Sequence, residues 1–321
     1  MAEAKPRADT CLPAVVRWML MAGLDGPAIV TEKLGKQYGS IRALIDLTLS
    51  VNRGEIFGFL GPNGAGKSTT IRLLLGYLRP TTGRAAILGL DIQKQHIAIL
   101  RRVGYLPSYA VFEEVVTGVQ ALDDLAGVAG ATPSRRGEIC ERVRLDEATL
   151  RRKVRDYSKG TRRKLGVVQA LQHDPEVIIM DEPTEGLDPL VQHSFYGMLE
   201  DLRQEGKTIF FSSHIISEVE RVCDRVAIVR QGSLVTVEHI STLVAKRQRH
   251  VEVRFDGIPP DLSSIPGVTN VFVDRGTVTC RLAGDVRPLL QHLATLPVRD
   301  LTIEQARLED VFLELYGEGE A

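Results

Sequence analysis

The residues from Gly61 to Thr70, Gly-Pro-Asn-Gly-Ala-Gly-Lys-Ser-Thr-Thr, have the types and spacing needed to hold a polyphosphate. They fit the pattern G-x-x-x-x-G-K-[ST] at its fixed positions, which are Gly61, Gly66, Lys67 and Ser68. Glycine adopts backbone conformations closed to other residues, so successive N–H groups can point inward at phosphate oxygens. The pattern predicts that Lys67 brings positive charge to the β- and γ-phosphates and that the Ser68 hydroxyl ligates Mg²⁺. The nucleotide-contacting residues expected from it are Gly61, Pro62, Asn63, Gly64, Ala65, Gly66, Lys67, Ser68 and Thr69.

The segments on either side of this loop have the patterns that it requires. Residues 56–60 form an apolar run typical of a short buried strand, and residues 71–75 continue a helix that should begin near Lys67. The positive end of that helix adds to anion binding. A glycine-rich turn that matches by accident would lack this order. The sequence therefore predicts a nucleoside triphosphate site.

A second candidate element is the run Val177-Ile178-Ile179-Met180-Asp181-Glu182-Pro183. An apolar strand that ends in two carboxylates puts them at the carboxyl edge of a sheet, where α/β proteins bind ligands. We expect Asp181 to hold the Mg²⁺ shell and Glu182 to lie beside the water that attacks the γ-phosphate. Taken alone, such an acidic pair is more often a solvated turn. Beside a phosphate loop in the same sheet, the catalytic interpretation is favoured.

Composition sets broad limits on the class of protein. The chain has 321 residues, 44% hydrophobic and 25% charged, with a net charge of −1, which gives no global case for binding nucleic acid or anionic membrane. Its four cysteines are scattered without metal-ligand spacing, as expected of free thiols in a reducing cytosol. We interpret residues 1–26 as an N-terminal extension, because the apolar run 11–24 is shorter than the roughly 20 residues that a membrane span needs. Any membrane part would then belong to another chain.

Between residues 27 and 246, short strand and helix signals alternate, which predicts an α/β domain with a sheet covered on both faces. Residues 110–172 show helical periodicity without strand character, so we expect a helical insert there. From residue 249 to 321 we expect a small C-terminal domain. Strand patterns at 250–255, 271–273, 277–282 and 298–303, with helices at 286–296 and 308–316, suggest a ferredoxin-like α+β domain of β-α-β-β-α-β order.

Further motifs fall in the order found in the ATP-binding cassette (ABC) family, which the chain resembles over roughly residues 28–240. Tyr157-Ser158-Lys159-Gly160-Thr161 is similar to the family signature Leu-Ser-Gly-Gly-Gln. Gly186-Leu187-Asp188-Pro189 resembles the loop that crosses the dimer interface, and Phe211-Ser212-Ser213-His214 resembles the segment that ends in the switch histidine. The full set in order is far more specific than any one motif.

This resemblance implies roles for residues outside the phosphate loop. Tyr38 would stack on adenine, although an edge tyrosine is often only a packing residue. Ser158 and Gly160, at the expected start of a helix, would contact the γ-phosphate held by a second subunit, and Ser158 is also a plausible plain helix cap. The dimer interface would include Ser158, Lys159, Gly160 and Asp188, and the catalytic set would be Lys67, Glu182 and His214. Residues 151–164 hold eight basic residues and one acidic one, either a solvated helix face or a surface toward the nucleotide.

The chain also departs from the family pattern. Ser108 follows Gly104-Tyr105-Leu106-Pro107 where the family has a glutamine that reaches Mg²⁺ and the attacking water. A serine is too short for that contact, which puts metal coordination and rate in question. Lys159 and Thr161 replace signature residues, and Glu185 stands where a small residue is common.

The resemblance implies an ATP-hydrolysing subunit of an exporter-type transporter, with ATP and Mg²⁺ as cofactors. Its expected partners are separate permease subunits and a second copy of itself or a paralogous cassette, with no nucleic acid. It would work on the inner face of the cell membrane, bound to the permease. One alternative is a soluble ABC ATPase acting on ribosomes or DNA. It is disfavoured because there is one cassette and because Ser158 lies 91 residues after Lys67, which leaves no room for a long coiled coil. Another is a regulatory module without turnover, motivated by Ser108.

Overall fold

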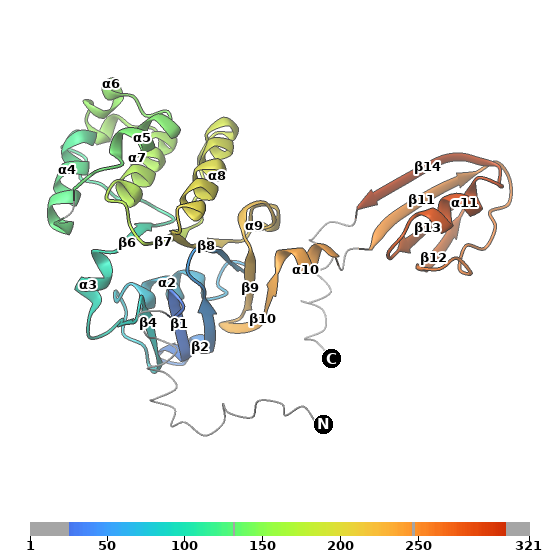
Figure 1. Cartoon of the computed structure of the whole chain (residues 1–321), viewed down its shortest axis with the longest axis horizontal. Helices are drawn as coiled ribbons and strands as arrows, with labels where there is room; N and C mark the ends of the chain where they lie inside the picture. The colour runs from blue at the N-terminus through green and yellow to red at the C-terminus, as the bar shows by residue number, and fades with distance from the viewer. Residues whose placement is uncertain (1–25, 131, 246–247, 306–321) are drawn as a thin grey trace, which may run out of the picture. The chain divides into compact units, whose positions relative to one another are not determined.

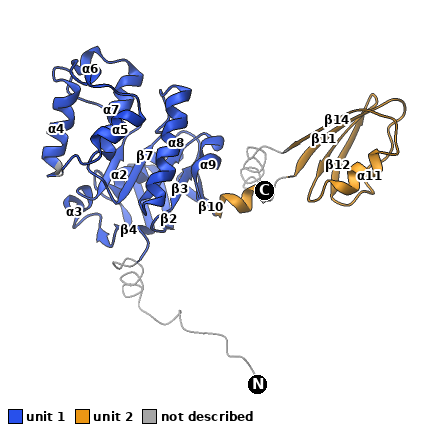
Figure 2. Ribbon diagram, turned by 45° about the horizontal axis from the view of Figure 1, so that its top comes forward, with its two compact units in different colours: residues 1–237 blue, residues 238–321 orange. Residues whose placement is uncertain are grey.

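The computed structural model describes residues 26–130, 132–245 and 248–305 (Figure 1). The chain divides into two compact units, Met1–Val237 and Glu238–Ala321 (Figure 2). Helix α10 (Ile240–Ala245) therefore falls within the second unit. The domain boundaries that we placed after residues 26 and 246 stay predictions. The expected N-terminal extension and the helix expected at 308–316 lie outside the described residues, apart from residue 26.

The first unit is built around a six-stranded sheet with the order β10-β9-β3-β8-β7-β6. Neighbouring strands from β9 to β6 pair in parallel. Every residue of the two strands that lead into the predicted site, β3 and β7, is buried, which explains why both read as uninterrupted apolar runs. The strands are β3 (Ile56–Leu60), β6 (Val103–Leu106), β7 (Val177–Asp181), β8 (Thr208–Ser213), β9 (Arg225–Arg230) and β10 (Ser233–His239).

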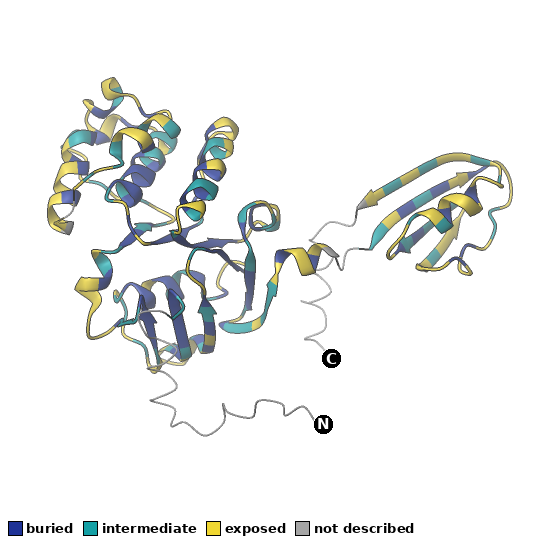
Figure 3. Cartoon of the chain, viewed as in Figure 1, coloured by how far each residue is buried: buried dark blue, intermediate teal, exposed yellow. Residues whose placement is uncertain are grey.

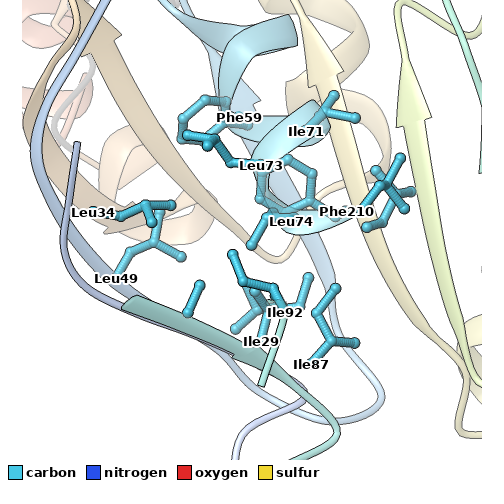
Figure 4. Packing of buried hydrophobic residues seen from close by; sticks show 14 of the residues in the cluster. Ile29, Leu34, Leu49, Phe59, Ile71, Leu73, Leu74, Ile87, Ile92 and Phe210 are labelled. Carbon is cyan, nitrogen blue, oxygen red and sulfur yellow. The ribbon is translucent and has the colours of Figure 1, made fainter. Parts of the chain in front are cut away.

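A second, antiparallel sheet with the order β2-β1-β4-β5 packs below the first in the view of Figure 1. Its strands are β1 (Ile29–Tyr38), β2 (Ile41–Val51), β4 (Thr82–Ile87) and β5 (Leu90–Asp91). Helix α2 (Lys67–Leu74) lies between the two sheets, and Ile71, Leu73 and Leu74 meet side chains of both (Figure 4). Phe59 and Phe210 of the parallel sheet pack with ring centroids 5.2 Å apart. Burying each such side chain contributes about 1.5–3 kcal/mol, so this core holds the loop before α2 in place.

Helices occupy the remainder of this unit. Between β6 and β7 the chain forms α4 (Gly118–Ala129), α5 (Arg136–Arg142), α6 (Glu147–Leu150), a 3₁₀ turn (Val154–Asp156) and α7 (Lys159–Leu171). Helix α3 (His96–Leu100) precedes β6, while α8 (Pro189–Gln204) and α9 (Ile216–Val222) follow β7 and β8. Buried positions run along the inner faces of α7 and α8 (Figure 3).

The second unit contains a four-stranded antiparallel sheet with the order β12-β13-β11-β14. The elements are β11 (Arg249–Phe255), β12 (Val268–Asp274), β13 (Thr277–Leu282), α11 (Arg287–Leu293) and β14 (Val298–Gln305). The expected order β-α-β-β-α-β implies a helix between the first two strands, and this part of the prediction is wrong, because residues 256–267 form turns and loop between β11 and β12. Three prolines in this segment (Pro259, Pro260 and Pro266) disfavour a helix, and its core contacts come from buried Leu262 and Ile265.

Candidate nucleotide-binding and catalytic site

The loop from Gly61 to Gly66 leaves β3 at the middle of the parallel sheet and enters α2. Gly66 has φ of +102°, and a Cβ on it would lie 2.7 Å from the Ala43 carbonyl oxygen. A Cβ on Gly61 would lie 2.4 Å from the Val229 oxygen. The backbone path of the loop therefore requires glycine at both positions, in agreement with the sequence motif.

Helix α2 begins at Lys67 without a side-chain cap and without an acidic residue in its first turn. The first backbone N–H groups of a helix have no intrahelical acceptor, and the helix dipole makes that end positive. The N-terminal end of α2 therefore carries no acidic side chain that would compete with a bound anion, so this end of the helix suits a phosphate.

The side chain of Lys67 is 7% exposed and is buried against the phosphate loop. Nζ donates to the Gly61 oxygen at 2.7 Å and to the Pro62 oxygen at 3.2 Å, and it lies 3.3 Å from Oε1 of Glu182. Gly61 and Pro62 thus orient the lysine. The contact with Glu182 joins the phosphate loop to the end of β7.

Asp181, at the end of β7, connects that strand to helix α2 and to strand β8. Its Oδ2 accepts a hydrogen bond from the Ser68 hydroxyl at 2.8 Å, and its Oδ1 accepts one from the Ser212 hydroxyl at 2.6 Å. Ser68 and Asp181 therefore offer a hydroxyl and a carboxylate oxygen side by side. Hard oxygen ligands of this kind, few in number and completed by phosphate and water, are the set that Mg²⁺ takes in phosphate-binding sites.

Glu182 has φ of +48°, a conformation uncommon for a residue with a Cβ. Its N–H donates to the Ser212 oxygen at 3.1 Å, which ties the strained residue to β8. Its Oε2 lies 2.8 Å from Nδ1 of His214 and accepts from the His214 N–H at 3.3 Å. The side chain of Glu182 is 14% exposed and that of His214 is 46% exposed, so Glu182 lies toward the protein interior and His214 toward solvent.

These groups surround a cavity of about 370 Å³, and its lining includes a large part of the predicted set. The cavity is lined by Ala43, Asn63, Gly64, Gly66, Lys67, Ser68, Thr69, Ser108, Glu182, Glu185 and His214. Tyr38, at the end of β1, is 44% exposed and does not line it. Gly61, Pro62, Ala65 and Asp181 do not line the cavity, but three of them hold residues that do: Gly61 and Pro62 accept hydrogen bonds from Lys67, and Asp181 accepts one from Ser68.

The predicted signature residues lie apart from this lining, on and around the start of α7. Ser158 caps the helix, because its hydroxyl oxygen accepts from the Thr161 N–H at 3.1 Å. A Cβ on Gly160 would meet the Gly186 oxygen at 3.1 Å, so the signature touches the loop before α8. Asp188 caps α8 through the Val191 N–H at 3.0 Å, and this bond holds the pKa of its carboxyl below the ordinary value.

Two departures from the family pattern contact each other. Nζ of Lys159 donates to Oε1 of Glu185 at 2.7 Å, and both side chains are more than half exposed. This hydrogen bond, with the nearby charge of Lys159, lowers the pKa of Glu185. Glu185 also lines the cavity of the phosphate loop. The pair therefore connects the signature to the nucleotide site within one chain.

Sequence reasoning missed the residue that joins these elements, Arg163. It was counted within the basic run 151–164, but only 4% of it is exposed. Its guanidinium donates to five backbone carbonyl oxygens, those of Pro107, Ser108, Asp181, Glu182 and Pro183. The signal was present in the sequence, because Arg163 shares a face of α7 with Gly166, Val167 and Ala170 at spacings of three, four and seven.

The comparisons with known proteins agree with this geometry. Residues 44–185 match the family model described as ABC transporter. The bacitracin transport ATP-binding protein BcrA of Bacillus licheniformis is 33% identical over 91% of this chain and 98% of its own length. The Nod factor export ATP-binding protein I of Cupriavidus pinatubonensis is 34% identical over 92% of this chain and 94% of its own length. The chain belongs to the ATP-binding subunits of ABC transporters.

A solved structure of such a subunit, described as an ATP-binding subunit of an ABC transporter, covers 67% of this chain and 91% of its own. It has a TM-score of 0.63 and 30% sequence identity. The α/β cassette fold and ATPase activity expected from the sequence are thereby confirmed. Among the described residues, no helix has the length and apolar character needed to cross a membrane.

Proposed function

We propose that this ABC subunit powers export through separate membrane subunits, and that two copies close over ATP to do so. The names of the relatives, which refer to bacitracin transport and Nod factor export, support the exporter assignment. The observation that carries the two-copy mechanism is that the signature residues do not line the cavity of their own phosphate loop. Each chain then supplies half of two composite sites. The protein would act at the inner face of the cell membrane, held there by its permease.

Binding of ATP uses the loop and the start of α2. Backbone N–H groups from Asn63 to Thr69 and the Lys67 ammonium group neutralise the phosphates, in a cavity that the protein already shapes. Ser68 and Asp181 would hold Mg²⁺, which neutralises charge on the transferring phosphoryl group when it is bound. Tyr38 would contact adenine from the neighbouring edge of β1.

Hydrolysis depends on Glu182 and His214. A carboxylate fixed beside the γ-phosphate orients water and accepts its proton, and we assign that role to Glu182. His214 is bound to the same carboxylate at 2.8 Å, so it can orient Glu182 and contact the terminal phosphate from the solvent side. Ser158 and Gly160 of the second copy would complete the site from the start of its α7.

The membrane subunit would dock on an apolar hollow between α3, β6, α4 and α7. This cavity has a volume of about 540 Å³. Several of its apolar side chains are exposed, including Val111 at 80% and Tyr109 at 67%, as expected of an interaction surface. The segment from Pro107 to Phe112 lines it and also carries Ser108, which lines the nucleotide cavity. Because one segment lines both cavities, contact with a permease would affect the nucleotide site.

The alternatives are less well supported by the observations. A cassette acting in DNA repair would carry a long coiled coil before the signature. The longest helix described between Lys67 and Ser158 is α4, with 12 residues. A regulatory module without turnover would not need the contacts of Glu182 with Lys67 and His214.

The variant Glu182→Gln tests the proposal in the full chain. It should bind ATP as the wild type does, lose turnover by about 10²–10⁴-fold, and accumulate as a dimer in MgATP. Turnover is measured by phosphate release and the dimer by light scattering after size-exclusion chromatography. Glu138→Gln, a surface change on α5, is the matched control and should behave as wild type. Unchanged turnover in Glu182→Gln would contradict the site assignment, and a monomer at saturating MgATP would contradict the two-copy mechanism.

A further inference from the structure

The guanidinium of Arg163 holds together two loops that leave neighbouring strands. Nη1 donates to the carbonyl oxygens of Pro107 and Ser108, the latter at 3.2 Å, just after β6. Nε donates to the Pro183 oxygen at 2.9 Å, and Nη2 donates to the oxygens of Asp181, the last residue of β7, at 3.2 Å and of Glu182 at 2.5 Å. One side chain on α7 thus fixes the backbone on both sides of the catalytic carboxylate.

This arrangement is costly, which is why it calls for a functional explanation. The five hydrogen bonds of Arg163 go to backbone carbonyl oxygens rather than to a carboxylate, and burial lowers the pKa of its guanidinium to about 10. A buried cation is retained only where its hydrogen bonds are well satisfied, and each carbonyl would otherwise be left without this donor. An apolar residue on the same helix face would pack against β6 without that cost.

The carbonyls that Arg163 holds belong to unusual residues. Glu182 has φ of +48°, so its peptide groups need external support to keep the carboxylate directed at Lys67 and His214. Ser108 lines the nucleotide cavity but has a side chain too short to span it. Its backbone is instead tied to the same guanidinium as the Glu182 carbonyl.

We propose that Arg163 is a positioning residue for hydrolysis, which sets the orientation of Glu182 and couples it to the Ser108 segment through one hydrogen-bonded centre. The inference rests on the proposed role of Glu182. It predicts that Arg163 acts on the hydrolytic step and on the Glu182–His214 contact, and has little effect on binding of ATP.

The test compares Arg163→Met and Arg163→Lys in the full chain. Met removes every donor while keeping a long side chain, and Lys keeps the charge with fewer donors. Arg102→Gln is the matched control, because Arg102 bonds Glu176 at 2.5 and 2.6 Å and joins β6 to β7 at the opposite end of the strands. A melting curve for each variant establishes that it is folded.

Two readouts separate positioning from general stability. The first is single-turnover hydrolysis of MgATP with protein in excess, alongside the dissociation constant for ATP. We expect a loss of about 100-fold in rate for Arg163→Met, a smaller loss for Arg163→Lys, and dissociation constants within about threefold of wild type. The second is the NMR signal of the His214 ring at fixed pH, assigned with His214→Gln, which should move in Arg163→Met and stay in place in Arg102→Gln.

The outcomes distinguish this inference from the proposed function. If Glu182→Gln abolishes hydrolysis while a folded Arg163→Met keeps the wild-type rate and His214 signal, Arg163 has no positioning role. If Glu182→Gln itself hydrolyses ATP normally, the assignment of Glu182 fails. The His214 signal in Arg163→Met then still reports whether the guanidinium orients that carboxylate, because the signal does not depend on activity.

Discussion

Oε2 of Glu182 lies 2.8 Å from Nδ1 of His214, so the carboxylate and the imidazole form one hydrogen-bonded pair at the edge of the nucleotide cavity. Each side chain leaves the carboxyl end of a different parallel strand, β7 and β8, and those strands are neighbours. The pairing of the strands therefore determines the pairing of the two groups.

The first prediction follows from this contact. His214→Ala removes the imidazole that pairs with Glu182 and to which we assign a contact with the γ-phosphate, so turnover of ATP should fall by about 10²–10³-fold. The affinity for ATP should stay within about threefold, because the phosphate loop is untouched. Steady-state phosphate release and calorimetric titration measure the two quantities. His193→Ala, which removes a surface imidazole beside Arg221, should change neither; a small effect of His214→Ala on rate would argue against the switch role.

The second prediction concerns Lys67. A hydrogen bond between a charged donor and phosphate contributes about 1.5–3 kcal/mol, so Lys67→Ala should weaken ATP binding by about 10–100-fold. The dissociation constant is measured by fluorescence titration of the full chain. Lys207→Ala, which removes a lysine paired with Asp174 outside the cavity, serves as the control. Binding of ATP to Lys67→Ala with wild-type affinity would place the phosphates elsewhere.

The third prediction tests the path of the phosphate loop. Gly66→Ala introduces a Cβ at φ of +102° and 2.7 Å from the Ala43 oxygen. The left-handed conformation alone costs about 1–2 kcal/mol, which for a unit of this size lowers the melting temperature by about 2–8 °C. We also expect loss of ATP binding.

Gly127→Ala is its matched control, since a Cβ there meets no atom within 4 Å and the residue lies within α4. Alanine favours a helix over glycine by about 0.5–1 kcal/mol, so this variant should melt slightly higher than wild type. Thermal unfolding followed by circular dichroism measures both. Equal melting temperatures for the two variants would show that the loop tolerates a Cβ.

The fourth prediction concerns the Lys159–Glu185 pair. Lys159→Gly removes the hydrogen-bonded cation from the Glu185 carboxylate at the nucleotide cavity, which should weaken ATP binding about 2–5-fold. Adding Glu185→Gln should restore the affinity, and the double-mutant cycle measures the coupling between the two residues. The effect should shrink at high salt, because both side chains are exposed. Equal loss in the single and double variants would mean that Lys159 contacts nucleotide independently of Glu185.

The same pair has a defined pH dependence. Lys159 lowers the pKa of Glu185 in the folded protein. The stabilisation is therefore complete above the ordinary glutamate pKa of about 4.3 and is lost as the pH falls through the lowered value. Between pH 6 and 8, the coupling energy from the cycle should be constant.

The sequence was sufficient for the parts of the fold that have strong local patterns. Fully buried strands such as 56–60 and 177–181 read as apolar runs, and the phosphate loop is fixed by backbone conformations that only glycine provides. Contacts that depend on long-range packing were not visible. The bond of Lys159 to Glu185 joins residues 26 positions apart, and Arg163 reaches carbonyls up to 56 positions away.

Other misses have different physical causes. Strand β10 (Ser233–His239) has mostly half-buried residues, so it lacks a clear apolar or alternating pattern. The first helix expected in the second unit was inferred from the order of the other elements, against the local evidence of Pro259 and Pro260. The prolines disfavour a helix in this segment, which forms a loop that buries Leu262 and Ile265 instead.

The helical insert leaves the parallel sheet after β6 and returns to it at β7, and these two strands are hydrogen-bonded neighbours in the register Val103 with Val177. Because the insert is anchored in the same sheet at both ends, at the carboxyl end of β6 and the amino end of the parallel strand β7, the length of chain between them can change at a small entropic cost without altering the alignment of the strands. Mutation and recombination can therefore rework α4 to α6, and with them the surface offered to other proteins, while Arg163 of α7 and the two carboxylate residues that it supports, Asp181 and Glu182, keep their places. The topology thus separates helices whose sequence can diversify from the catalytic carboxylates, whose positions must be conserved.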